Sequence, residues 1–194
     1  MEYINIASIR TCTEAEGPGK RFALWVQGCN KRCKGCCNPE MQKIEKKNIV
    51  LVSDIEKIIE NSYKDNSIEG ISIIGGEPML QAKGLSELAK WCQNKGLSVL
   101  VFSGYTYEEL VSIDKNYIND FLKYIDVLVD GEFLEDEYDY ERDWVGSKNQ
   151  KIWYLTQRYS NNIEKEKGIR QMEILIKNDV FQVNGWPFEE YNGK

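Results

Sequence analysis

The sequence predicts an α/β fold: a partial βα barrel with a mostly parallel sheet, open along one side. Apolar segments of strand length alternate along the chain with segments that repeat at helical period, which is typical of parallel sheets with crossover helices. The chain has 194 residues, whereas a complete eightfold βα barrel takes about 250. Three successive predicted strands end in Gly-Gly, Ser-Gly or Asp-Gly, at the position where α/β folds place their sites.

The first half of the chain is expected to supply two strands and two helices. Segment 21–28 (RFALWVQG) is the first predicted strand, and a cysteine-rich loop follows it directly. In SDIEKIIENSY, Ser53 and Glu56 have the spacing of a capping box and isoleucines recur at helical period, which predicts a helix. Segment 69–78 (EGISIIGGEP) reads as a short buried strand, and 79–95 as the next helix.

The second half continues the alternation and ends in a predicted β-hairpin. Thr106 and Glu109 are expected to cap a helix, and RQMEILIK is expected to pair with VFQVNGW across Asn178 and Asp179. The other strands are expected at 97–105 (LSVLVFSGY), 124–133 (YIDVLVDGEF) and 151–157 (KIWYLTQ). We therefore expect a core domain over residues 1–157 and a C-terminal extension over 158–194 that packs on it. The extension begins with the polar stretch 158–168.

The composition excludes several classes of function. A net charge of −6 argues against a binder of nucleic-acid backbones. The chain lacks a long apolar run and a secretory signal, which predicts a cytoplasmic protein without a membrane partner. It contains no histidine, so Cys2His2 zinc sites, Ser/His and Cys/His pairs and histidine bases are excluded.

Residues 28–40 (GCNKRCKGCCNPE) hold four of the six cysteines. Cys29, Cys33 and Cys36 are spaced C-x3-C-x2-C, and Cys37 follows at once. A disulfide staple is disfavoured in the reducing cytoplasm, and a buried helix is disfavoured by the polar and glycine residues between the thiols. Structural zinc usually takes four ligands from two separated pairs. A [4Fe–4S] cluster normally takes four thiolates, so three would leave one iron open to a small molecule.

This C-x3-C-x2-C spacing resembles the signature of the radical S-adenosylmethionine (SAM) enzymes. The resemblance implies a partial βα barrel of the radical SAM type, with Cys29, Cys33 and Cys36 as ligands of a [4Fe–4S] cluster and SAM on the open iron. Cys12, Cys37 and Cys92 are expected to be free thiols that bind no iron. Because the cofactor carries the chemistry, no catalytic side chain is expected.

Gly75, Gly76 and Glu77 resemble the family's GGE motif, which binds the amino group of SAM. Adjacent glycines at a strand end let a backbone approach a ligand closely, and a glutamate supplies an anionic acceptor for an ammonium group. Ser103 and Asp130 lie at the ends of the next two predicted strands. The resemblance places them near the ribose and carboxylate of SAM.

The stretch EGPGKRFALWVQGCNKRCKGCCNPE resembles the activating proteins of anaerobic ribonucleotide reductases, as do FSGYTYEEL, VLVDGEF and WVGSKNQ. The resemblance covers about Thr11 to Gln150. It implies an oxidoreductase that cleaves SAM reductively to a 5′-deoxyadenosyl radical, which abstracts hydrogen from a glycine of a large glycyl-radical enzyme. It also implies a flavodoxin- or ferredoxin-type electron donor.

The chain departs from this subgroup at several positions. The activating proteins generally have an aromatic residue at the position of Cys37, and their cysteine loop ends in Thr-Trp where this chain has PEMQ. Lysine is common in them at the position of Glu132, and the C-terminal tail of this chain is longer than theirs. Two other functions therefore stay open: a small radical SAM enzyme that modifies a peptide or metabolite, and a non-catalytic Fe–S or zinc module. A gene for a glycyl-radical enzyme in the same genome would favour the activase, whereas bound zinc and indifference to SAM would favour the last.

Overall fold

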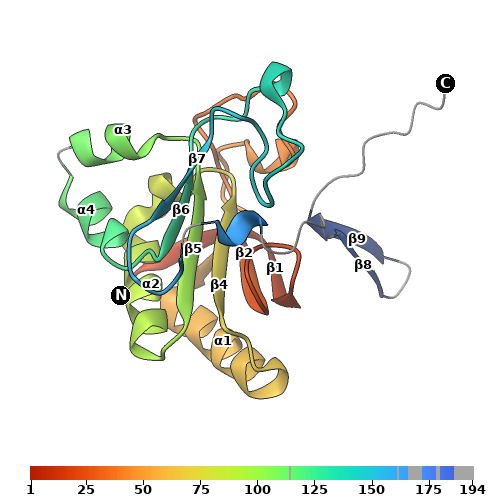
Figure 1. Ribbon diagram of the computed structural model, residues 1–194. Helices are drawn as coiled ribbons and strands as arrows, with labels where there is room; N and C mark the ends of the chain where they lie inside the picture. Colours follow the sequence, from red (N-terminus) through yellow and green to blue (C-terminus); the bar gives the residue numbers. More distant parts are fainter. Residues whose placement is uncertain (114, 161, 166–171, 178–179, 186–194) are drawn as a thin grey trace.

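The computed structural model describes residues 1–113, 115–160, 162–165, 172–177 and 180–185 (Figure 1). Its strands are β1 (Tyr3–Thr13), β2 (Arg21–Val26), β3 (Asn48–Leu51), β4 (Gly70–Gly75), β5 (Ser98–Ser103), β6 (Val127–Asp130), β7 (Lys151–Tyr154), β8 (Met172–Lys177) and β9 (Val180–Gly185). Its α-helices are α1 (Val52–Asn66), α2 (Ala82–Asn94), α3 (Tyr107–Ser112) and α4 (Asn116–Leu122). Short 3-10 turns are η1 (Pro39–Met41), η2 (Pro78–Gln81), η3 (Glu135–Glu137) and η4 (Ile163–Lys165).

Seven of these strands form one mixed sheet in the order β3-β1-β2-β4-β5-β6-β7. Its centre is parallel, because β2, β4, β5 and β6 pair in parallel with one another. Strand β1 runs antiparallel to both β2 and β3, and β7 runs antiparallel to β6. Five of the seven strands therefore point in one direction, and the predicted α/β class with a mostly parallel sheet is confirmed.

The helices pack on one face of this sheet only. Along β5, Val99 and Val101 belong to the large core cluster that also contains the apolar side chains of the α-helices. Leu100 and Phe102 alternate with them and point to the opposite face. There Leu100 packs with Val145 of the loop before β7, so loops cover this face and leave room for a site.

Two details of the N-terminal half differ from the sequence-based expectations. Strands β1 and β3 were not predicted, and β1 pairs with both β2 and β3. The capping box at Ser53 is wrong: α1 begins at Val52, and its N-cap, Leu51, makes no side-chain capping bond. By contrast, the predicted capping box of Thr106 and Glu109 is present at the start of α3.

Gly84 weakens the predicted helix 79–95 but has a packing role in the structure. The segment begins with the 3-10 turn η2 and becomes α-helical at Ala82. A Cβ atom at Gly84 would lie 2.6 Å from the carbonyl oxygen of Tyr3. The missing side chain therefore allows α2 to lie directly on the backbone of β1.

The predicted C-terminal hairpin is confirmed. Strands β8 and β9 pair antiparallel, and the expected turn at Asn178 and Asp179 lies outside the described residues. In Figure 1 the hairpin stands out from the body on the side of β1 and β2. In the part of the chain that the structure describes, none of the helices has the length and apolarity to cross a bilayer.

Candidate functional site

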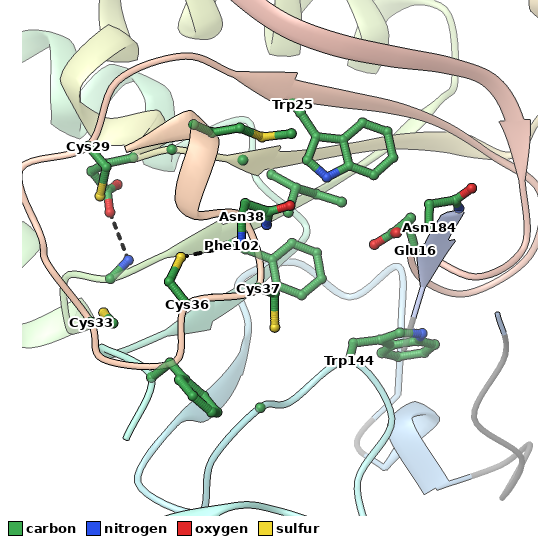
Figure 2. Close-up of a pocket in the computed structure, with 18 of the residues that line it drawn as sticks. Glu16, Trp25, Cys29, Cys33, Cys36, Cys37, Asn38, Phe102, Trp144 and Asn184 are labelled. Carbon is green, nitrogen blue, oxygen red and sulfur yellow. Dashed lines mark hydrogen bonds between the residues drawn. The ribbon is translucent and has the colours of Figure 1, made fainter. Parts of the chain in front are cut away.

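A cavity of about 520 Å³ opens at the carboxyl ends of the parallel strands. The ends of three strands and the cysteine loop meet there, as the glycine pattern predicts. From the strand ends come Gly75–Glu77, Ser103, Gly104 and Gly131, and from the loop come Cys29, Cys33, Cys36 and Cys37. Figure 2 shows the cavity with Cys29, Cys33 and Cys36 at one end and Glu16 and Asn184 at the other.

The structure brings Cys29, Cys33 and Cys36 to the same end of the cavity (Figure 2). All six cysteines are free thiols in the structure. The backbone N–H of Asn38 donates a hydrogen bond to Cys36 Sγ at 3.4 Å. Among the described residues, no three Cys, Asp or Glu side chains are close enough together to bind a single metal ion.

The loop is held in place by its own basic residues. Arg32 Nη1 donates to the carbonyl oxygens of Cys29 and Gln42, at 2.8 and 2.9 Å. Lys31 Nζ lies 2.9 Å from Glu132 Oε1 and 4.2 Å from the centre of the Tyr105 ring. The lysine therefore ties the cysteine loop to the residues that follow β5 and β6.

The pKa of Cys29 is raised to about 11, mainly because the thiol is buried and partly because Glu77, Cys33 and Cys36 are close. Burial also raises the pKa of Cys33. Both groups are therefore neutral thiols at pH 7 in the free chain, and each would release a proton on binding a metal.

Gly75 and Gly76 are required by the packing of β4 against β2. Gly75 has φ +105°, a conformation that side chains rarely adopt. A Cβ atom at Gly76 would lie 2.3 Å from the carbonyl oxygen of Gly28. The backbone N–H of Gly76 donates to Val26 O, and that of Glu77 to Gly28 O, each at 2.8 Å. Both glycines thus fix the strand end beside the first cysteine.

The Glu77 carboxylate lies in the wall of the cavity and is 1% exposed. It accepts hydrogen bonds from Met79 N at 2.9 Å, Gly104 N at 2.8 Å and Ser103 Oγ at 2.9 Å. Burial raises the pKa of Glu77 to about 7, against the lowering effect of these donors. Lys31 acts in the same direction as the donors.

Ser103 and Asp130 have different positions. Ser103 lines the cavity and orients Glu77. Asp130 is buried outside the cavity lining, and its carboxylate accepts from Tyr107 N, Lys151 N and Trp153 Nε1. All three donors belong to neighbouring elements, so Asp130 links the end of β6 to β7 and to α3.

The opposite end of the cavity was not anticipated. Glu16 accepts from Gly185 N at 2.7 Å, and the Asn184 side chain also hydrogen-bonds to it. Trp144, with φ +64°, and Cys37 line the space between (Figure 2). The sequence signal was the Glu16-Gly-Pro-Gly stretch, but its proximity to residues 183–185 depends on how the hairpin docks.

Comparisons with known proteins agree with this arrangement. Residues 15–153 match the 4Fe-4S single cluster domain family. The chain is 34% identical to the anaerobic ribonucleoside-triphosphate reductase-activating protein of Vibrio cholerae, over 72% of this chain and 91% of that protein. Identity is 36% to the protein of the same name from Haemophilus influenzae, over 70% and 88%. It is 27% to that of Enterobacteria phage T4, over 79% and 96%.

The matched region contains the cysteine loop, the three glycine-terminated strand ends and Glu16. It ends before β8 and β9. The chain therefore belongs to the family of anaerobic ribonucleoside-triphosphate reductase-activating proteins and carries the 4Fe-4S single cluster domain.

Proposed function

We propose that this chain is a radical SAM activase, which uses a [4Fe–4S] cluster and SAM to create a glycyl radical on an anaerobic ribonucleotide reductase. The observation that carries the proposal is the arrangement of three thiols at one end of a cavity whose adjoining wall is the Gly75–Glu77 strand end. The match to reductase-activating proteins over most of the chain supports the same reaction.

Cys29, Cys33 and Cys36 would hold the cluster. In a [4Fe–4S] cluster each thiolate would bind a different iron. Hydrogen bonds to the sulfurs tune such clusters, and the Asn38 N–H is in place to donate one.

When bound, the cluster supplies one electron for the cleavage of SAM, which yields the radical that abstracts hydrogen. The chain's own residues position the substrate for this step. The Glu77 carboxylate and the backbone at Gly75 and Gly76 would hold the amino group of SAM, and Ser103 would keep Glu77 oriented. Asp130 would act through the strand end that it braces, because its oxygens are already occupied.

The same proposal covers the barrel, the domain division and the cellular setting of the protein. The sheet would be the wall of an open radical SAM barrel, with its loop-covered face as the interior. Residues 1–157 would be the core domain, and 158–194 an extension packed on it. The protein would work in the cytoplasm with a flavodoxin- or ferredoxin-type electron donor.

Anaerobic reconstitution tests the proposal. The loaded protein, reduced in the presence of SAM, should yield 5′-deoxyadenosine on chromatography, and it should produce a glycyl-radical signal when the reductase is added. Cys29→Ala, Cys33→Ala and Cys36→Ala should each abolish deoxyadenosine formation and lower the iron and sulfide content per chain. Cys37→Ala is the matched control and should retain both.

Absence of deoxyadenosine from a protein with a full cluster would refute the radical reaction. Loss of the cluster in Cys37→Ala, with retention in Cys36→Ala, would reassign the third ligand. A second candidate function is a radical SAM enzyme for a peptide or metabolite. It is favoured by the contribution of Val183, Asn184 and Gly185 to the cavity wall, and it predicts deoxyadenosine without any radical on the reductase.

A further inference from the structure

The C-terminal hairpin β8–β9 is a feature that the family's shared chemistry does not require. The family match ends at residue 153, whereas the hairpin begins at Met172. The relatives from V. cholerae and H. influenzae are aligned over about nine-tenths of their own length but only 72% and 70% of this chain. The hairpin therefore lies outside the matched family region, and its role is expected to be specific to this chain.

The base of the hairpin is fixed to β1 and the loop that follows it. Asn184 accepts from Arg10 Nε at 3.2 Å and donates to Thr13 Oγ1 at 2.9 Å. Gly185 N donates to Glu16 at 2.7 Å, and Glu14 N donates to Glu173 at 2.8 Å. Three of these bonds hold the end of β9, and the fourth holds the start of β8 beside it.

The end of β9 lies at the rim of the cavity. Val183, Asn184 and Gly185 are among its lining residues, and Figure 2 shows Asn184 beside Glu16 at the end away from Cys29. A substrate that enters from this end therefore passes the end of β9.

The rest of the hairpin presents apolar side chains to solvent. Ile174 lies directly opposite Val183 in the register, so the two side chains share one face, and Ile176 lies two residues further along that face. Their exposed fractions are 51% for Ile174, 47% for Val183 and 74% for Ile176. Because Val183 also lines the cavity, this apolar row runs outward from the cavity rim.

We infer that the apolar row Ile174, Ile176 and Val183 is the docking surface for the protein that carries the target glycine. This inference rests on the proposed function, in which a segment of a large partner must enter the cavity. A small molecule would contact the cavity walls and leave Ile176 in water. A macromolecule whose loop enters the cavity covers the rim and the adjoining row together, through an apolar patch beside its glycine segment.

The test uses the full-length, cluster-loaded protein and the anaerobic ribonucleotide reductase encoded in the same genome. The double variant Ile174→Lys with Ile176→Lys places two charges on the docking surface and leaves the cavity lining intact. Val111→Lys is the control, because Val111 on α3 is also 51% exposed. The readouts are the dissociation constant for the reductase, deoxyadenosine formed without reductase, the glycyl-radical yield, and the molecular mass in solution.

We expect the double variant to bind the reductase at least about tenfold more weakly and to give less glycyl radical, with unchanged deoxyadenosine formation. Val111→Lys should match the wild type in every readout. Equal binding by the double variant and the wild type would overturn the inference. So would a wild type that does not bind the reductase, or a double variant whose molecular mass in solution changes while its reductase binding does not.

A loss of deoxyadenosine formation in the double variant would also overturn it, since the hairpin would then support the shared site. Failure of the proposed function has a different signature, because the wild type itself would form no deoxyadenosine. The binding comparison does not depend on that reaction, so it decides the docking inference separately.

Discussion

Glu16 and Glu77 are carboxylates at the two ends of the cavity, and burial raises the pKa of each to about 7. They differ in their surroundings. Glu77 is held by Ser103 and by backbone donors of the strand ends, whereas Glu16 is held by the hairpin. The position of Glu77 suits an ammonium ligand. The position of Glu16 links the protonation of its carboxylate to the packing of β9 against the core.

The raised pKa of Glu16 predicts a pH dependence of stability. In the unfolded chain its pKa is the ordinary 4.5, and in the folded chain it is about 7. The group therefore stabilises the fold fully below about pH 4.5, and this contribution is lost as the pH rises through 7. The loss is roughly 2 kcal/mol, allowing for partial solvent access from the cavity.

Urea unfolding of the cluster-free protein between pH 4.5 and pH 8 measures this effect. In Glu16→Gln the amide oxygen still accepts from Gly185 N, but the side chain does not titrate. The difference in unfolding free energy between wild type and variant should fall by about 2 kcal/mol across this range. Parallel curves would show that Glu16 has an ordinary pKa.

At the scale of the elements, Arg21 joins three parallel strands on the face without helices. It is fully buried at the start of β2. Its guanidinium donates to Ser72 Oγ on β4 at 2.7 Å and to Ser98 Oγ on β5 at 3.0 Å. It also donates to Tyr159 Oη of the extension at 3.3 Å. Ser72 Oγ in turn donates to Glu16 O, so the arginine indirectly fixes the loop at the far end of the cavity.

Arg21→Met should lower the unfolding free energy by roughly 3 kcal/mol or more, because methionine fills the space but leaves several buried acceptors without a donor. Urea titration of the cluster-free protein measures the change. Lys57→Met is the control: Lys57 is exposed and pairs with Asp54, and its loss should cost within about 0.5 kcal/mol. A stable Arg21→Met variant would mean that the network contributes little.

At the scale of the whole molecule, the extension is connected to the core at separate places. Tyr159 bonds to Arg21 and Ser98, Glu164 accepts from Tyr154 Oη at 2.6 Å, and Asn184 bonds to β1. The middle of the sheet is stabilised by its large apolar core, whereas the hairpin depends on the few polar contacts at its base. The hairpin is therefore expected to open without unfolding of the sheet.

Asn184→Ala tests this separation, because it removes the bonds to Arg10 and Thr13. Hydrogen exchange of the β8 and β9 amides should become about thirtyfold faster, at roughly 1 kcal/mol for each of the two bonds, while the β4 and β5 amides keep their rates. Asn66→Ala, at the end of α1, should leave both sets unchanged. Faster exchange throughout the sheet would show that hairpin and core open together.

Elements whose signals are local could be predicted from the sequence. Apolar runs ending in glycine located β4, β5 and β6, Thr106 with Glu109 located the start of α3, and the spacing of Cys29, Cys33 and Cys36 indicated the cluster loop. These signals suffice because strand period, capping and ligand spacing are properties of neighbouring residues. A local signal can also be wrong: Ser53 has the spacing of an N-cap, but α1 begins at Val52 and has no side-chain cap.

Contacts between distant residues depend on how the chain packs in three dimensions. The resemblance predicts Asp130 as a site residue, and the structure adds that its oxygens accept from donors on two other elements, α3 and β7. The sequence predicts Gly76 as a ligand-binding position, and the structure adds that a side chain there would strike the backbone of Gly28. Glu16 and Asn184 lie 168 positions apart in the sequence and share one end of the cavity. Such contacts arise from the packing of distant segments, whose pairing no local pattern encodes.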